Sequence, residues 1–200
     1  WMLQLADKTK AAVTGSLIIK ENEKFYNRLL WATPEGGVYF YDKRHLFSFA
    51  GEDAHYSRGD SRLIVELKGW KICPLICYDL RFPIWSRNQN LKGKFADFEY
   101  DLLIYVANWP KPRTATWSSL LVARAIENQA FVAGVNRVGE DGNGIEYDGA
   151  SALIDPKGDV ISNFQLGEEA IKTFTIKLDD LNAFREKFPV GLDSDGFKIY

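Results

Sequence analysis

The chain has 200 residues, of which 46% are hydrophobic and 26% charged, and its formal net charge is −2. These values are typical of one folded domain with a sizeable core, and they give no electrostatic reason to expect binding to nucleic acid or to an anionic membrane. The two cysteines argue against a disulfide scaffold, and no apolar run is long enough to cross a bilayer.

The cysteines and the first residues lead to two further expectations, one about the cellular compartment and one about the N-terminus. Because both cysteines look unpaired, we expect a reducing, cytoplasmic compartment. The chain begins with Trp1 before Met2, so we expect that an N-terminal part is missing, and any targeting signal would lie there.

The first half of the chain predicts a short helix followed by strands. Residues 1–10 predict the end of an amphipathic helix. Residues 44–60 lack a clear period and predict a long loop, a feature that is often functional in a compact domain. Breaker residues between the β-rich runs predict two hairpins. The predicted strands are residues 11–20, 27–33, 37–43, 61–67 and 70–80.

The second half alternates strands with helices. Residues 101–109 form a continuous apolar run, typical of a strand covered on both faces. A helix is predicted at 116–129, capped by Thr114 or Thr116, and a short one near 181–188. The remaining predictions are a strand at 130–138, a turn at 141–144, a hairpin within 147–163 and a strand at 169–178. We therefore predict a single α/β domain over residues 1–200, with sheets covered by helices.

Cys77 is the first candidate for chemistry. It ends an apolar strand and is followed by the polar run from Tyr78 to Arg81. A small nucleophile at a strand end, before a turn into a helix, is how α/β folds present a reactive atom, and the N–H of Tyr78 could then face an oxyanion. The alternative is an inert buried cysteine, the common fate of a free thiol.

Other readings of the cysteines and histidines are weaker. Cys73 and Cys77 would lie roughly 13 Å apart along an extended strand, too far for a disulfide. His45 and His55 have no standard metal-ligand spacing with the cysteines, so we predict no metal site. Either histidine could act as a base for a Cys–His pair, but nothing in the sequence singles one out.

Three charged residues have ordinary explanations when they are considered alone. Lys43 ends an aromatic strand and could be a solvated charge in a turn. Glu52 could be a loop carboxylate, and Glu127 a charge at the end of a helix. If Lys43 faces the thiol instead, we expect it to matter for chemistry more than for folding.

Four motifs, in order and with compatible spacing, change these interpretations. They are YDKRHLF around Lys43, ICYDLRFP around Cys77, YVANWP at 105–110 and ARAIENQAFVAGVNRVG at 123–139. Together they resemble the nitrilase superfamily of carbon–nitrogen hydrolases, and most closely its omega-amidase, or YafV-like, branch. The resemblance runs from about Trp1 to the EKFP motif at 186–189.

The resemblance implies a four-layer α-β-β-α sandwich, here without its N-terminal strand and helix, and a Glu–Lys–Cys triad. By this resemblance Cys77 is the nucleophile, Lys43 the triad lysine and Glu52 a further active-site glutamate. The triad base glutamate matches no residue upstream of Lys43, so we expect it before Trp1. The other implied roles are substrate binding for Tyr78, Asn108 and Trp109, and support for Glu127 and Arg81.

The implied activity is amide hydrolysis without a metal or organic cofactor. The leading expectation is release of ammonia from a short dicarboxylate monoamide such as 2-oxoglutaramate, through a cysteine thioester. Arg81 could supply a counter-charge for the substrate carboxylate, or could be part of a structural ion pair. The alternatives are another superfamily member acting on a carbamoyl amine or a modified peptide amide, and a non-catalytic relative. The expected partners are a small-molecule amide and a second subunit in a homodimer, by analogy only.

Overall fold

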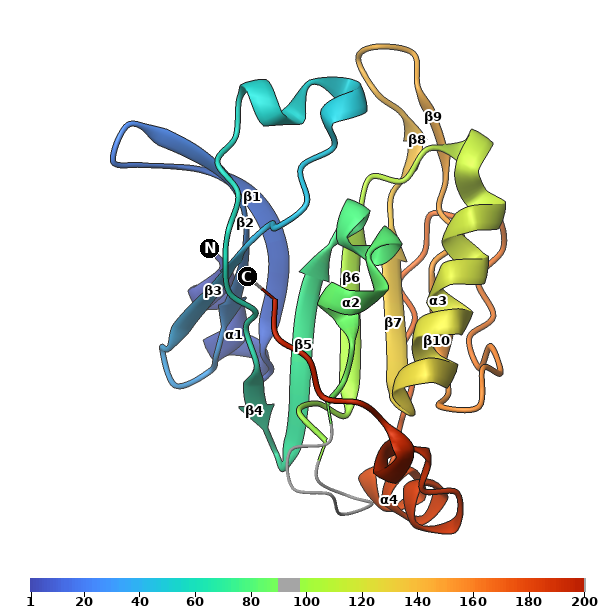
Figure 1. Cartoon of the computed structure of the whole chain (residues 1–200). Coiled ribbons are helices and arrows are strands. Elements are labelled where there is room, and N and C mark those ends of the chain that lie inside the picture. Colours follow the sequence, from blue (N-terminus) through green and yellow to red (C-terminus); the bar gives the residue numbers. More distant parts are fainter. Residues whose placement is uncertain (90–97, 200) are drawn as a thin grey trace.

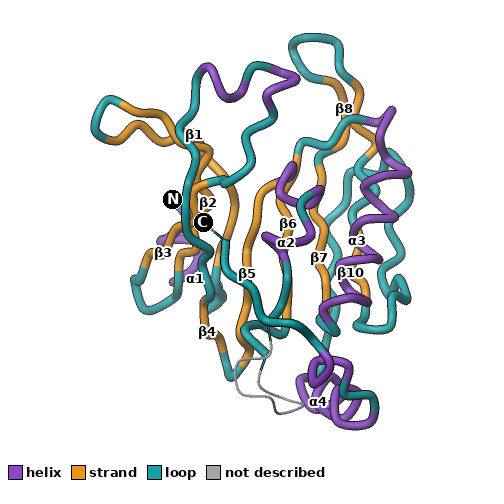
Figure 2. Tube along the Cα trace, viewed as in Figure 1, coloured by secondary structure: helices purple, strands orange, loops and turns teal. Residues whose placement is uncertain are grey.

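The computed structural model describes residues 1–89 and 98–199, and its elements follow the order shown in Figures 1 and 2. The strands are β1 (Val13–Glu21), β2 (Lys24–Ala32), β3 (Val38–Asp42), β4 (Val65–Leu67), β5 (Trp70–Ile76), β6 (Leu102–Ala107), β7 (Phe131–Asn136), β8 (Val138–Glu140), β9 (Glu146–Asp148) and β10 (Ala152–Ile154). The α-helices are α1 (Met2–Thr9), α2 (Pro83–Ser86), α3 (Thr114–Asn128) and α4 (Leu178–Lys187). Short 3₁₀ turns are η1 (Ser48–Ala50), η2 (Glu52–Ala54), η3 (Cys77–Arg81), η4 (Lys111–Arg113) and η5 (Val190–Asp193).

Two sheets form the centre of the fold. The predicted hairpin joins β2 to β3, and with β1 these strands make an antiparallel sheet in the order β1-β2-β3. The second sheet has the order β10-β7-β6-β5-β4, in which β5, β6 and β7 are parallel and the two edge strands are antiparallel. Strands β8 and β9 pair separately as a hairpin. Because β5, β6 and β7 run in one direction, their carboxyl ends meet at one edge of the sheet.

The two sheets pack face to face, and helices cover their outer faces. Trp31 of β2 lies in one apolar cluster with Ile72 of β5 and Val65 of β4, so this cluster joins the sheets. On the other face of the larger sheet, Trp117 and Leu121 of α3 are fully buried against β7. Helix α1 packs against β1 and β2. The predicted α-β-β-α arrangement is therefore confirmed (Figure 1).

A glycine sets the spacing between α3 and the sheet. A Cβ atom at Gly134 of β7 would lie 2.4 Å from Leu121 and 2.8 Å from Trp117. Those distances are far inside van der Waals contact, so any larger residue would push the helix away from the sheet. The strand at 130–138 and the helix at 116–129 were predicted separately, and this contact explains how closely they pack.

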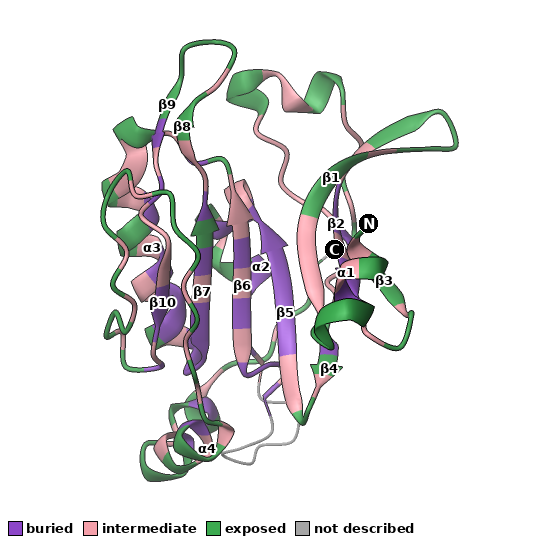
Figure 3. Ribbon diagram, turned by 180° about the vertical axis from the view of Figure 1, so that it is seen from behind, coloured by how far each residue is buried: buried purple, intermediate pink, exposed green. Residues whose placement is uncertain are grey.

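Three local predictions are wrong or incomplete. Helix α3 begins at Thr114, and its N-cap Arg113 makes no side-chain cap bond. The Thr114 hydroxyl instead donates to the Asp148 carboxylate at 2.7 Å. This contact with a distant residue takes the place of the predicted bond to the backbone at the helix start. The strand predicted at 169–178 is not formed: residues 171–178 alternate between exposed and half-buried (Figure 3), but they have no ladder partner within the part of the chain that the structure describes. The hairpin in 147–163 reduces to β10 and a single bridge.

Strand β6 is less enclosed than its apolar sequence predicted. Leu103 and Tyr105 are fully buried under α3, whereas Leu102 and Ile104 on the opposite face are only half-buried. Among residues 1–89 and 98–199, none of the helices has the length and apolar character that crossing a bilayer requires.

Candidate active site

Cys77 lies directly after β5, at the carboxyl edge of the larger sheet. The preceding residues Ile72 and Ile76 are buried, and η3 turns the chain away from the strand. Cys77 has a φ of 44°, in the left-handed region that non-glycine residues seldom occupy. Strain of this kind is concentrated at functional turns. The Cys77 Sγ is 3.8 Å from the carbonyl oxygen of Asn108, which follows the neighbouring strand β6.

Lys43 and Glu52 form a short ion pair that is almost closed to solvent. The Nζ of Lys43 lies 2.5 Å from Oε2 of Glu52, and the Lys43 side chain is only 4% exposed. The backbone N–H of Phe47 donates to the same oxygen at 2.6 Å, and Asn27 donates to Oε1 at 3.1 Å. The loop predicted at 44–60 folds into η1 and η2, and this brings Glu52 back to Lys43. Lys43 is therefore buried and ion-paired, and the alternative of a solvated charge in a turn is wrong.

Cys77, Lys43 and Glu52 line the same cavity, which has a volume of about 590 Å³. Asn108 also lines it, and its backbone carbonyl contacts the thiol. This volume is in the range of small-molecule sites. The structure thus brings together the three residues that the sequence resemblance assigned to catalysis: Lys43 directly after β3, Glu52 in η2 and Cys77 directly after β5.

Burial and charge act in opposite directions on the two acidic groups of this cavity. Burial raises the pKa of the Glu52 carboxyl, but the Lys43 charge and the hydrogen bonds from Lys43, Phe47 and Asn27 outweigh it, so the pKa stays below 4.5. Burial raises the pKa of the Cys77 thiol above 9.0, and the nearby Lys43 charge only partly offsets this effect. The thiol therefore needs a proton acceptor to react at neutral pH.

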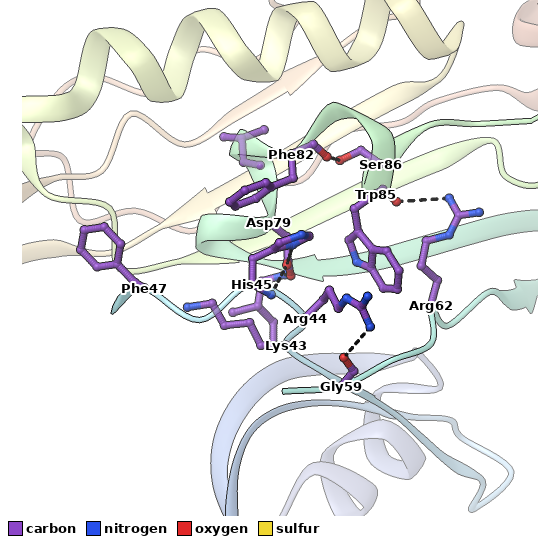
Figure 4. A network of polar contacts seen from close by, with 12 residues as sticks. Lys43, Arg44, His45, Phe47, Gly59, Arg62, Asp79, Phe82, Trp85 and Ser86 are labelled. Carbon is purple, nitrogen blue, oxygen red and sulfur yellow. Dashed lines mark hydrogen bonds and ion pairs between the residues drawn. The ribbon is translucent and has the colours of Figure 1, made fainter. Parts of the chain in front are cut away.

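Asp79, a residue that the sequence did not single out, ties the turn after Cys77 to the segment that carries Lys43. It is completely buried in η3. Its Oδ2 accepts from the Tyr41 hydroxyl at 2.7 Å and from the backbone N–H of Ile76 at 3.1 Å. Its Oδ1 accepts from the backbone N–H of His45 at 3.1 Å and lies 2.8 Å from the His45 ring Nδ1 (Figure 4). One carboxyl thus connects Ile76, which precedes Cys77, to Tyr41 and His45, which lie on either side of Lys43.

His45 is fixed by this network. Its ring stacks on Phe82 with centroids 3.7 Å apart, and its Nδ1 is bonded to Asp79 (Figure 4). It lines neither cavity that Cys77 lines. A Cys–His pair using His45 is therefore not what the geometry supports.

A second cavity, of about 920 Å³, lies on another side of the thiol. Cys77, Asn108 and Phe47 line both cavities, whereas Lys43 and Glu52 line only the first. The walls of the second cavity include the three predicted substrate-binding residues and one supporting residue: Tyr78, Asn108, Trp109 and Arg81. The sequence predictions for these residues are thus consistent with a place beside the thiol.

Trp109 and Arg81 form one wall of this second cavity. The guanidinium of Arg81 lies over the Trp109 ring, 5.1 Å from its centroid. Within the described residues Arg81 forms no ion pair, so the structural salt bridge that was the alternative for it is not seen there. Asn136 at the end of β7 holds the Trp109 backbone by accepting from its N–H at 2.7 Å and donating to its carbonyl at 3.0 Å. Sequence reasoning missed Asn136.

Glu127 and Cys73 lie away from the reacting groups. Glu127 pairs with Arg124 at 3.0 Å, and Arg124 donates to the Leu80 carbonyl of η3 at 2.6 Å. The Glu127 carboxylate therefore reaches the turn after Cys77 through Arg124. Cys73 is completely buried, and burial raises its pKa to about 12. Within residues 1–89 and 98–199, no group of three or more His, Cys, Asp or Glu side chains is arranged to hold a metal ion.

Comparison with known families and proteins agrees with this geometry. The family model described as carbon-nitrogen hydrolase matches residues 1–186. A crystal structure of a CN-hydrolase superfamily protein from Xanthomonas campestris, which carries an arsenic adduct in its active site, superposes with a TM-score of 0.96 at 46% identity. That match covers 100% of this chain and 75% of the other. The chain belongs to the carbon–nitrogen hydrolase family.

Two curated relatives indicate which kind of carbon–nitrogen hydrolase this chain is similar to. Omega-amidase YafV of Escherichia coli (strain K12) is 48% identical over 200 residues, covering 100% of this chain and 75% of the relative. The 2-oxoglutaramate amidase of Bacillus subtilis (strain 168) is 39% identical over 192 residues, covering 95% of this chain and 71% of the relative. These findings place the chain among the amidases of the nitrilase superfamily.

Proposed function

We propose that the protein hydrolyses the omega-amide of a short dicarboxylate monoamide, such as 2-oxoglutaramate, to the acid and ammonia. The observation that carries this proposal is the shared cavity, in which the Cys77 thiol faces the same space as the Lys43–Glu52 pair. The names of the omega-amidase and 2-oxoglutaramate amidase relatives support the choice of substrate.

The reaction follows from the groups around the cavity. The Cys77 sulfur attacks the amide carbon, its proton passes to a base, and a tetrahedral oxyanion forms. The Lys43 ammonium stabilises that negative charge. The base then returns the proton to the nitrogen, the C–N bond breaks, ammonia leaves, and the acyl group remains on sulfur as a thioester. Water, deprotonated by the same base, attacks the thioester carbon and releases the acid and the free thiol.

Glu52 is better suited to orient Lys43 than to accept the thiol proton. Its carboxylate already accepts from Lys43, Phe47 and Asn27, and its pKa lies below 4.5. A carboxylate whose pKa is lowered and whose oxygens already accept from three donors is a poor acceptor for the thiol proton. We therefore assign Glu52 to positioning Lys43, and leave the role of triad base to the glutamate that the resemblance implies.

The assignment of the base has a direct test. Glu52→Gln should lower kcat but keep the acid limb of the pH profile of kcat, because a group that only positions Lys43 does not itself carry the transferred proton. Loss of that acid limb in Glu52→Gln would instead make Glu52 the base.

The substrate assignment is tested by released ammonia. The wild-type protein is assayed on 2-oxoglutaramate and on an N-carbamoyl amine, with Cys77→Ala as the matched inactive control. We expect a clear preference for 2-oxoglutaramate and no release by the variant. A preference for the carbamoyl amine would instead favour another activity of the superfamily.

Two further expectations accompany this proposal. Both Cys73 and Cys77 are free thiols, which is consistent with a reducing compartment such as the cytoplasm. A homodimer is proposed by analogy with the family, and size-exclusion chromatography with light scattering would distinguish it from a monomer.

A further inference from the structure

The second cavity contains a second arginine, Arg113, that sequence reasoning did not identify. Arg113 directly precedes α3 and lines the cavity together with Cys77. Its guanidinium lies over two aromatic rings of the 44–60 loop, 5.6 Å from the centroids of both Phe47 and Phe49. Stacking on aromatic faces holds a guanidinium in place while its N–H edge stays available for a planar anion.

The backbone of Arg113 is fixed independently of its side chain. Its carbonyl accepts from the Trp109 ring N–H at 2.8 Å, and its own N–H donates to the Pro110 carbonyl at 2.9 Å. Trp109 is in turn held by Asn136. The side chain therefore projects from a rigid support into the cavity wall, which is what a binding group requires in order to select a ligand.

The carboxylates of the same cavity are bonded to other groups. Asp141 accepts from the backbone N–H groups of Asn143 and Ile145 and from the Tyr147 hydroxyl, and Glu146 pairs with Lys111 at 3.2 Å. Within residues 1–89 and 98–199, Arg113 has neither an ion pair nor a side-chain hydrogen bond. A half-buried guanidinium that has no counter-ion among the described residues, in a cavity that the nucleophile also lines, suits a ligand that brings its own negative charge.

We propose that Arg113 binds the carboxylate at the far end of the substrate and is the main determinant of specificity for anionic acyl chains. This inference rests on the proposed function and deepens it. The amide carbon lies at Cys77, where the two cavities meet, with the Lys43–Glu52 pair on one side. The acyl chain extends through the second cavity toward Arg113. The planar guanidinium of Arg113 can donate two parallel hydrogen bonds to a carboxylate.

Arg113 is a stronger candidate than Arg81 for this role. Arg81 is exposed, whereas Arg113 is half-buried against Phe47. A charge pair gains more where water is partly excluded. The Phe47 N–H also donates to Glu52, so one loop residue contacts both the catalytic pair and the arginine.

The test compares a charged with a neutral substrate. We compare the wild-type protein with four variants, each assayed on 2-oxoglutaramate and on uncharged pentanamide. The variants are Arg113→Gln, Arg113→Lys, Arg81→Gln and Arg58→Gln. Arg58 is an exposed arginine that lines neither cavity, and it serves as the matched control. Thermal melting verifies that each variant is folded.

We expect Arg113→Gln to lower the ratio of kcat/KM for 2-oxoglutaramate to kcat/KM for pentanamide by roughly 10- to 100-fold, mainly through KM, the scale of one charge-assisted bond. Arg113→Lys should fall between the wild type and Arg113→Gln, and inhibition by 2-oxoglutarate should weaken in parallel. An unchanged ratio in Arg113→Gln, or a larger fall in Arg81→Gln, would overturn the proposal. If the wild type itself prefers pentanamide, the proposed function is wrong. If the wild type prefers 2-oxoglutaramate and Arg113→Gln leaves the ratio unchanged, only the role of Arg113 is refuted.

Discussion

The carboxyl of Asp79 connects the turn after Cys77 to the segment of Lys43, and changing it to asparagine tests that connection. Asparagine keeps the size but replaces one acceptor oxygen by a donor. The Tyr41 hydroxyl already accepts from the Arg44 N–H at 3.1 Å and the Trp85 ring N–H at 3.0 Å, so it cannot readily accept a third. The N–H groups of Ile76 and His45 cannot accept at all. Either orientation of the amide therefore leaves at least one buried backbone N–H without a partner.

One unpaired buried N–H costs roughly 1–3 kcal/mol, and in a chain of this size each kcal/mol lowers the melting temperature by about 2–4 °C. Asp79→Asn should therefore melt roughly 2–12 °C below the wild type, and Asp79→Ala, which removes every acceptor, lower still. Turnover should fall more than substrate affinity, because the mutation disturbs the alignment of Cys77 with Lys43. Differential scanning calorimetry and steady-state kinetics measure the two effects.

The matched control is Asp53→Asn, an exposed aspartate in η2 with no side-chain bond among the described residues. It should change neither melting temperature nor kcat. If Asp79→Asn melts within 1 °C of the control, the carboxyl does not hold these segments together, and the reasoning about the network is refuted.

The remaining predictions concern the thiols and the ion pair. Iodoacetamide should label Cys77 and spare the fully buried Cys73 in the folded protein, and preferential labelling of Cys73 by peptide mapping would contradict the assignment. Lys43→Met should slow turnover by roughly 10²-fold or more, the loss of an oxyanion partner, and near-normal kinetics would exclude that role. It should also lower the melting temperature, because it leaves Glu52 unpaired, a cost that the sequence alone did not indicate. Because the folded pKa of Glu52 is lowered, its contribution to stability is present above pH 4.5 and is lost as the pH falls through the folded value. Glu52→Gln should therefore flatten the acid limb of a stability curve measured by urea unfolding, and an unchanged limb would count against the pair.

Local patterns were sufficient for most strands and for the position of Cys77. Strand β5 is a short apolar run that ends in polar residues, and the hairpin of β2 and β3 is marked by Pro34 and glycines. Both signals lie within a few residues of the structure that they specify. The four-layer arrangement came from the resemblance, since periodicity does not determine which sheet packs on which.

The residues that were missed depend on contacts between distant parts of the chain. Asp79 meets Tyr41 and His45 across 38 and 34 positions, and its only signal was its place inside the ICYDLRFP motif. Asn136 holds Trp109 across 27 positions. No local period reports such pairs, and a polar residue in a buried strand end looks like any other until its partner is known.

The wrong predictions have the same cause. Thr114 satisfies the local rule for a helix cap, but Asp148 lies close enough to bind its hydroxyl. Residues 171–178 alternate in exposure as a strand does, but they have no neighbouring strand to pair with inside the described chain. In both cases the pattern was correct, and a tertiary contact or its absence decided the outcome.

The central claim is that the acyl group of an omega-amide passes through Cys77, and an acid quench during turnover tests it most directly. The wild-type protein is mixed with 2-oxoglutaramate and quenched with acid while substrate remains. It is then digested, and its peptides are mapped by mass spectrometry. We predict that the Cys77 peptide carries the mass of 2-oxoglutaric acid less one water, and that Cys77→Ala shows neither this adduct nor ammonia release. Ammonia release by the wild type with no acyl group on Cys77, or with the adduct on Cys73, would contradict the account.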